Sequence, residues 1–150
     1  MDIKSGAGYP ASALSNFAPH PFTLDGVEIA SMEGFLQSLK FENPEMQKHV
    51  CTLVGFAAKK KGKFKNWQEK GKLYWQGQEI DRFGEDYQAL LDRAYDAMFK
   101  ENEGARKALL ATQGATLEHS IGRTKEAETI LTRREFCSRL TKIREHLQAT

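Results

Sequence analysis

The sequence has few of the residues that mark disulfide-rich, metal-binding or membrane-spanning proteins. Among its 150 residues are only two cysteines, four prolines and four histidines. Cys51 and Cys137 lie far apart in the chain and outside any Cys-x-x-Cys pair, so we expect reduced, buried thiols rather than a disulfide framework. No histidine spacing is typical of metal ligands, and we expect neither a metal nor another cofactor.

Long apolar runs and an excess of one charge are also missing. No stretch is long enough to span a bilayer, and residues 1–10 hold no apolar run typical of a signal peptide, so we expect a cytoplasmic protein without membrane contact. Twenty-two Lys and Arg against twenty Asp and Glu give a formal charge of +2. This charge is too small for a dedicated nucleic-acid binder, and any cationic site must be local.

The sequence does have enough apolar material for a folded core. Hydrophobic residues make up 40% of the chain, and nine Phe, four Tyr and two Trp are among them. The length matches the commonest size of one domain, and neither a repeat nor a linker is visible. We expect residues 1–150 to form a single domain.

Apolar spacing predicts a mainly α fold, α+β with a small N-terminal β-hairpin. The hairpin is expected over residues 22–29, around the Asp25-Gly26 turn. Helices are expected where apolar residues recur at helical spacing; they cover residues 31–42, 43–57, 82–102, 105–111 and 132–147, with caps at Ser31, Asn43 and Thr132. The helix from Arg82 is expected to bury Phe83, residues 64–75 to be irregular, and residues 116–132 to be mostly loop.

One helical row carries reactive side chains. Glu33, Gln37 and Lys40 are separated by four and three residues, which places a carboxylate, an amide and an amine on the same helix surface. Taken alone, Glu33 is an ordinary first-turn carboxylate favoured by the helix dipole, and the other two are typical of a solvated face. The motif that surrounds the row favours a functional interpretation of these three residues.

The segment Leu14-Ser15-Asn16-Phe17, the Asp25-Gly26 turn and the pattern Ser31-x-Glu33-x-x-x-Gln37-x-x-Lys40 resemble the N-terminal signature of the YbiA-like (NADAR) family. The resemblance continues through Lys61-Gly62 and Trp67, covers about residues 14–144, and is strongest over 14–112. After Leu117 many members carry a Trp-Gly run that this chain lacks. The chain thus resembles a divergent member.

The resemblance implies a compact multihelical domain that hydrolyses an N-glycosidic bond in a nucleotide-derived metabolite, such as a riboflavin-pathway intermediate, or in an ADP-ribosyl adduct of guanine. Such cleavage passes through an oxocarbenium-like transition state, which a fixed carboxylate can stabilise while it orients the attacking water. Glu33 is the candidate for this role. His119 falls where many members have a carboxylate, and a histidine can protonate a leaving base near neutral pH.

Five further residues are candidates for substrate binding. Asn16 and Gln37 can hydrogen-bond hydroxyl or carbonyl groups, and Lys40 can hold a phosphate. Trp67 offers a flat face for a base, and Lys61, in the run 59–63, can meet a phosphate. Each also has a structural interpretation: a turn residue for Asn16, core packing for Trp67, and a solvated helix end for the lysines.

Two other functions stay open. A catalytically inactive module that binds ADP-ribose or a nucleotide agrees with the missing Trp-Gly run. A nucleic-acid-binding protein would use the lysine run with Phe64 and Trp67, against the near-neutral charge. Under the enzyme hypothesis the partner is a small nucleotide-derived molecule, nucleic acid enters only as a modified substrate, and no particular oligomeric state is predicted.

Overall fold

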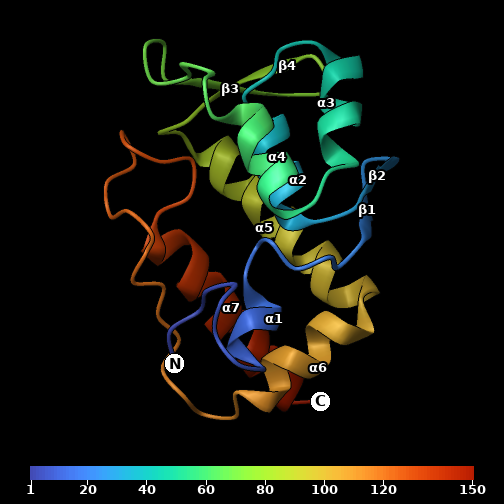
Figure 1. Ribbon diagram of the computed structural model, residues 1–150, viewed down its shortest axis with the longest axis vertical. Coiled ribbons are helices and arrows are strands. Elements are labelled where there is room, and N and C mark those ends of the chain that lie inside the picture. Colours follow the sequence, from blue (N-terminus) through green and yellow to red (C-terminus); the bar gives the residue numbers. More distant parts are fainter.

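A computed structural model describes residues 1–150. Seven helices and two small antiparallel sheets form an α+β fold, as the sequence predicts (Figure 1). The helices are α1 (Ala11–Leu14), α2 (Met32–Ser38), α3 (Pro44–Cys51), α4 (Gly55–Gly62), α5 (Glu85–Glu101), α6 (Glu103–Ala111) and α7 (Arg133–Gln148). The strands are β1 (Phe22–Leu24), β2 (Val27–Ile29), β3 (Lys72–Trp75) and β4 (Gln78–Asp81).

The predicted N-terminal hairpin is confirmed. β1 pairs with β2, and the two turn residues Asp25 and Gly26 have φ angles of 50° and 78°. Two consecutive positive φ values define the turn that matches the twist of a two-residue hairpin, which explains the Asp-Gly sequence. The Asp25 carboxylate accepts hydrogen bonds from Trp75 Nε1 at 2.8 Å and from Arg93 at 2.7 Å, and so ties the turn to the rest of the core.

The predicted helix starts are confirmed at three caps. The Ser31 side chain accepts from Gly34 N, Asn43 accepts from the first turn of α3, and Thr132 and Glu135 form a complete capping box at α7. Each cap satisfies amide groups that a helix leaves unpaired at its start. α2 ends at Ser38, earlier than expected, and its last turn continues as a looser turn through Lys40.

The prediction of one helix over residues 43–57 is wrong. α3 ends at Cys51, the chain turns through Thr52–Val54, and α4 begins at Gly55. Gly55 has a φ of 59°, a backbone conformation that interrupts a right-handed helix and favours glycine. The lysines therefore belong to a separate helix that packs directly against α2.

Two further predictions fail around residue 80. The segment 64–75, expected to be irregular, ends in β3, which pairs with β4 in a hairpin whose Gln76-Gly77 turn again has two positive φ angles. Phe83, expected in the core, is 54% exposed because α5 begins only at Glu85. Arg82 is buried in its place and pairs through both terminal nitrogens with Glu135 of α7, at 3.0 and 2.7 Å.

α5 runs through the middle of the molecule and separates two groups of elements (Figure 1). On one side lie α2, α3, α4 and the two hairpins; on the other lie α1, α6, α7 and the long loop that joins the last two. The buried face of α5 includes Tyr87, Leu91, Ala94, Tyr95 and Met98, which pack into a single apolar cluster. This cluster holds both groups of elements in place around one pocket.

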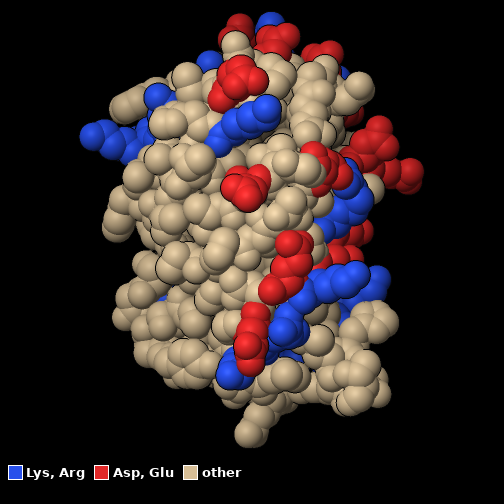
Figure 2. All heavy atoms as spheres, turned by 90° about the vertical axis from the view of Figure 1, so that its right-hand side faces the viewer, with Lys and Arg blue, Asp and Glu red and all other residues tan.

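The surface carries both signs of charge. Figure 2 shows acidic and basic side chains interspersed over the face on the side of α3 and β2. Both cysteines are free thiols, Cys51 buried and Cys137 partly buried. None of the helices is both long and apolar enough to cross a membrane.

Candidate active site

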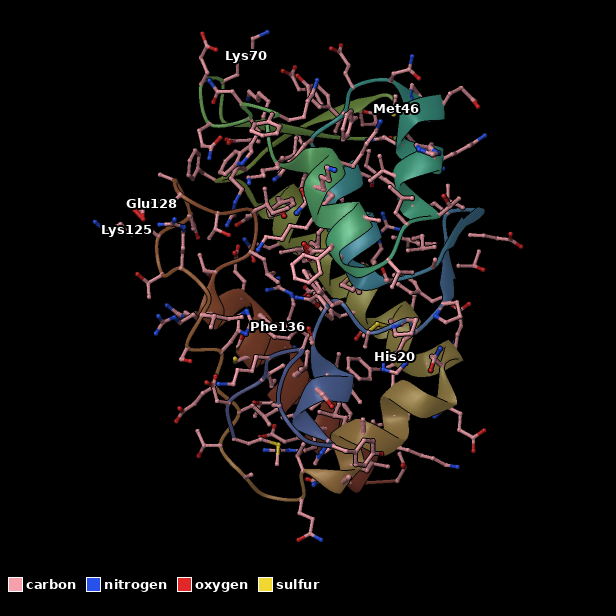
Figure 3. The ribbon with its side chains drawn as sticks, in the orientation of Figure 1. His20, Met46, Lys70, Lys125, Glu128 and Phe136 are labelled. Atoms are coloured by element: carbon pink, nitrogen blue, oxygen red, sulfur yellow. The ribbon has the colours of Figure 1, made fainter.

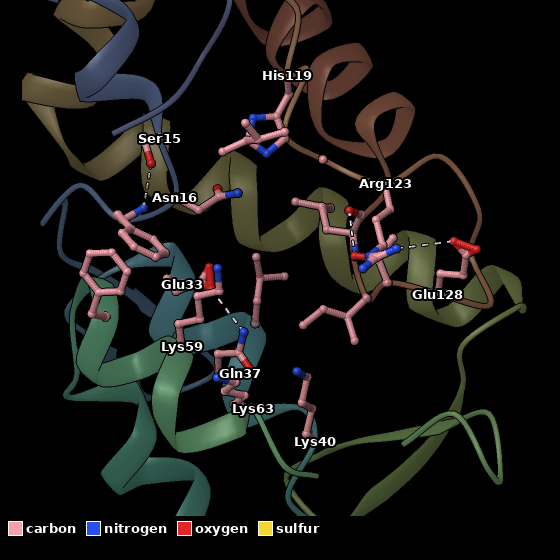
Figure 4. Close-up of a pocket in the computed structure, with 18 of the residues that line it drawn as sticks. Ser15, Asn16, Glu33, Gln37, Lys40, Lys59, Lys63, His119, Arg123 and Glu128 are labelled. Atoms are coloured by element: carbon pink, nitrogen blue, oxygen red, sulfur yellow. Dashed lines mark hydrogen bonds and ion pairs between the residues drawn. The ribbon is translucent and has the colours of Figure 1, made fainter. Parts of the chain in front are cut away.

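A cavity of about 500 Å³ opens between the two groups of elements (Figure 4). Three parts of the chain supply most of its lining: the Ser15–Phe17 segment with α2, α4 with the segment that follows it to Gln68, and the loop after α6. Ser5 of the N-terminal segment completes it. Six of the seven candidate residues proposed from the sequence line this one cavity; they are Asn16, Glu33, Gln37, Lys40, Trp67 and His119.

The helical row of α2 faces the cavity. Gln37 Nε2 donates a hydrogen bond to Glu33 Oε1 at 3.1 Å, and Lys40 Nζ lies 3.4 Å from the carbonyl oxygen of Gly62. Figure 4 shows the three side chains in line along one wall. The amide donor fixes the Glu33 carboxylate at the start of the row, and the amine is held at its far end.

Burial shifts the pKa values of the two charged residues in this row. It raises the pKa of Glu33, because the charged carboxylate is desolvated, although the Gln37 hydrogen bond and the positive charges of Lys40, Lys59 and His119 oppose the rise. Burial lowers the pKa of Lys40, partly offset by Glu33. A carboxylate with a raised pKa is a stronger base than an exposed one, and such groups gather at active sites.

Gly62 fixes the position of Gln37. A Cβ atom at residue 62 would lie 1.9 Å from Gln37 Oε1, so only glycine allows α4 to approach this close. Gln37 Oε1 is buried and has no hydrogen-bond partner, and the other end of the amide, Nε2, donates to Glu33. In the Lys61-Gly62 pair of the sequence resemblance, the glycine is therefore the residue that contacts the site.

Asn16 forms the corner of the cavity next to Glu33. Its backbone carbonyl accepts from Glu33 N at 2.9 Å, and its side-chain oxygen accepts from the hydroxyl of Tyr95 at 2.8 Å. The bond to Tyr95 orients the amide so that its nitrogen points toward the cavity (Figure 4). Tyr95 is fully buried in α5 and was not singled out from the sequence, where it looks like one more apolar position of the helix.

His119 lies across the cavity from α2, in the loop after α6 (Figure 4). Its Nδ1 atom is 2.7 Å from the carbonyl oxygen of Ile3, and its ring meets Phe136 edge-on at 5.1 Å between centroids. Contacts on two sides fix the ring. Phe136 belongs to the first turns of α7, which Figure 3 shows beneath this loop.

Lys61 and Trp67 lie differently from the other five candidate residues. Lys61 is exposed and does not line the cavity; Lys59 and Lys63 do, because residues three and four apart face the same side of a helix and Lys61 falls between them. Trp67 borders the cavity but is only 6% exposed and belongs to the core cluster. Its faces are covered by protein, so packing describes it better than base stacking does.

The loop after α6 adds residues that the sequence did not reveal. Ile121 is 68% exposed at the cavity, and Arg123 lies 3.7 Å from Glu128 in an ion pair that also lines it. Figure 3 shows Glu128 and Lys125 at the outer edge of this loop. With no secondary structure to give a period, the sequence offers no signal for which loop residues turn inward.

Comparison with known proteins identifies a matching family and a relative. The family model described as "Bacteriophage protein GP30.3" matches residues 8–145. A relative, the uncharacterized 17.1 kDa protein of the Gp30–rIII intergenic region in Enterobacteria phage T4, is 39% identical over 150 residues, 98% of each chain.

A similar fold occurs in the NMR structure of the E. coli protein YbiA. The two superpose with a TM-score of 0.63 at 18% identity, over 99% of this chain and 84% of that one. At this identity the likeness concerns the fold. It agrees with the YbiA-like resemblance of the N-terminal signature.

Proposed function

The chain belongs to the Bacteriophage protein GP30.3 family and has the fold of YbiA, and from this premise we propose that it hydrolyses an N-glycosidic bond. The substrate class is a nucleotide-derived metabolite or an ADP-ribosyl adduct. The observation that carries the proposal is a desolvated carboxylate, Glu33, set beside amide donors in a cavity of about 500 Å³ with lysines on its walls.

The reaction follows from this arrangement. As the bond from the ribose anomeric carbon to the base nitrogen breaks, the electron pair leaves with the nitrogen and the sugar becomes oxocarbenium-like. Glu33 stabilises the positive charge and takes a proton from the water whose oxygen bonds to the anomeric carbon. His119, across the cavity, supplies a proton to the leaving nitrogen.

The remaining polar groups hold the substrate. The amide nitrogen of Asn16 points to the cavity and can donate to a ribose hydroxyl, since the Asn16 oxygen is already occupied by Tyr95. Lys40, Lys59 and Lys63 supply positive charge for phosphate oxygens. The group of cations at one cavity supports an anionic substrate, although the protein as a whole is close to neutral.

A chromatographic assay tests the proposal. The wild type would be incubated with guanine-linked ADP-ribose on DNA and with ribosyl phosphates of the riboflavin pathway, and the products identified by mass. Release of free base together with the matching sugar product supports the hydrolase. Binding of ADP-ribose without release of product from any substrate supports instead the inactive binding module, which the chain's departure from the YbiA-like pattern after Leu117 favours.

A further inference from the structure

α4 presents a second row of side chains to the same cavity. Phe56, Lys59 and Lys63 are separated by three and four residues, and all three line the cavity. α4 packs against α2, so this row lies beside the row of Glu33, Gln37 and Lys40. α2 thus contributes a carboxylate to the cavity, and α4 contributes an aromatic ring followed by two amines.

Phe56 is exposed in a way that needs explanation. Its side chain is 76% exposed in the first turn of α4, where a buried phenylalanine would gain about 1.5–3 kcal/mol. The ring is nevertheless held in place: it meets Phe17 edge-on, with 5.1 Å between centroids and 76° between ring planes. Lys59 Nζ lies 6.0 Å from the centroid of Phe17, next to the aromatic pair.

A second segment that lines the cavity carries another exposed apolar side chain. Ile121, in the loop after α6, is also largely exposed and also lines the cavity. An aromatic ring and an aliphatic side chain that line one cavity from different segments can both contact a planar base. Trp67, which the sequence suggests for this purpose, is too deeply packed to offer a face.

We propose that Phe56 is the stacking platform for a planar base of the ligand, closed by Ile121, and that Lys59 and Lys63 bind the phosphate groups attached to it. The proposal rests on the proposed function, because it assumes that the cavity accepts a nucleotide-derived molecule. It identifies the residues that distinguish a base-bearing ligand from a bare sugar phosphate. Specificity for the base then depends mainly on α4, whereas the reacting groups are Glu33 on α2 and His119 in the loop after α6.

Titration calorimetry with two probes tests it: ADP-ribose, which carries a base, and ribose 5-phosphate, which does not. Phe56→Ala should weaken ADP-ribose binding about tenfold, the effect of losing one base–aromatic stack, and leave ribose 5-phosphate unchanged. Phe56→Trp should retain ADP-ribose binding. Lys59→Gln should weaken both probes, because both carry phosphate.

Phe83 provides the matched control. It is 54% exposed just before α5 and does not line the cavity, so Phe83→Ala should bind both probes as the wild type does. Unchanged ADP-ribose affinity in Phe56→Ala, an equal loss for both probes, or a wild type that does not bind ADP-ribose would each overturn the proposal. Binding is measured without turnover, so failure to hydrolyse any substrate would count against the proposed function alone.

Discussion

The Nδ1 atom of His119 lies 2.7 Å from the carbonyl oxygen of Ile3. A carbonyl can only accept, so Nδ1 carries the hydrogen and Nε2 is the nitrogen left to exchange a proton in the cavity. The N-terminal segment, far away in the sequence, thereby sets the tautomer of a proposed catalytic residue.

Replacing His119 with asparagine separates these two roles. The asparagine amide can still donate to Ile3 but has no group at the place of Nε2, so His119→Asn should fold normally and lose about 10²–10⁴-fold in kcat. Steady-state kinetics together with thermal melting measure both effects. A variant that keeps wild-type turnover would remove His119 from the mechanism.

Glu33→Gln should make the protein more stable at neutral pH. Burial raises the pKa of Glu33 in the folded state above its unfolded value, so the stability linked to its protonated form is present in acid and lost as pH rises through the folded-state pKa. Glutamine stays neutral throughout. The melting temperature of the variant should match the wild type in acid and exceed it increasingly toward neutral pH.

The control for this comparison is Glu28→Gln, on the exposed face of β2 away from the cavity. Its melting temperature should follow the wild type at every pH. If the melting temperature of Glu33→Gln also differs from the wild type by the same amount at every pH, the surroundings do not destabilise the Glu33 carboxylate, and Glu33 is not an activated base.

Gly62→Ala should impair activity although residue 62 carries no reactive group. The added Cβ would displace Gln37, break its hydrogen bond to Glu33 and shift the carboxylate, and misplacement of about 1 Å can cost 10²-fold in rate. Gly114→Ala is the matched control, because a Cβ there meets nothing within 4 Å. The prediction is contradicted if kcat/KM is equal in the two variants.

Arg82 and Glu135 form a buried ion pair whose disruption should destabilise the fold. Arg82→Gln leaves Glu135 without its charge partner in the interior, and urea denaturation should show a loss of about 3–5 kcal/mol. Lys107→Gln, which breaks an exposed pair with Glu103, should cost less than about 1 kcal/mol. Similar losses in both variants would show that burial of the Arg82 pair does not matter.

The sequence predicts those parts of the fold that depend on local residue preferences, such as helix caps and tight turns. Ser31, Asn43 and the Thr132–Glu135 pair are helix caps, Asp25-Gly26 is a hairpin turn, and all four predictions are confirmed. It mispredicts segments in which local pattern and tertiary packing disagree. The apolar spacing continues across Gly55, although the helix ends before it. Phe83 has the spacing of a core residue, but Arg82 is buried at this point of the chain and Phe83 is exposed.

The candidate site shows the same division. Glu33, Gln37 and Lys40 share a helix face, so their convergence follows from spacing alone. The approach of His119 from a loop and the burial of Trp67 depend on how distant segments pack, which no local pattern contains. Tyr95 and Phe56 were missed because a tyrosine in a helix interior and an exposed phenylalanine have no distinctive spacing.

A direct comparison of the wild type with Glu33→Gln tests whether the Glu33 carboxylate drives N-glycosidic hydrolysis in this cavity. ADP-ribose affinity and release of free base from guanine-linked ADP-ribose or a ribosyl phosphate would be measured on the same preparations. We expect equal affinity in both proteins, base release by the wild type, and release slowed at least about 10²-fold in the variant. Equal rates of release in both proteins would contradict it.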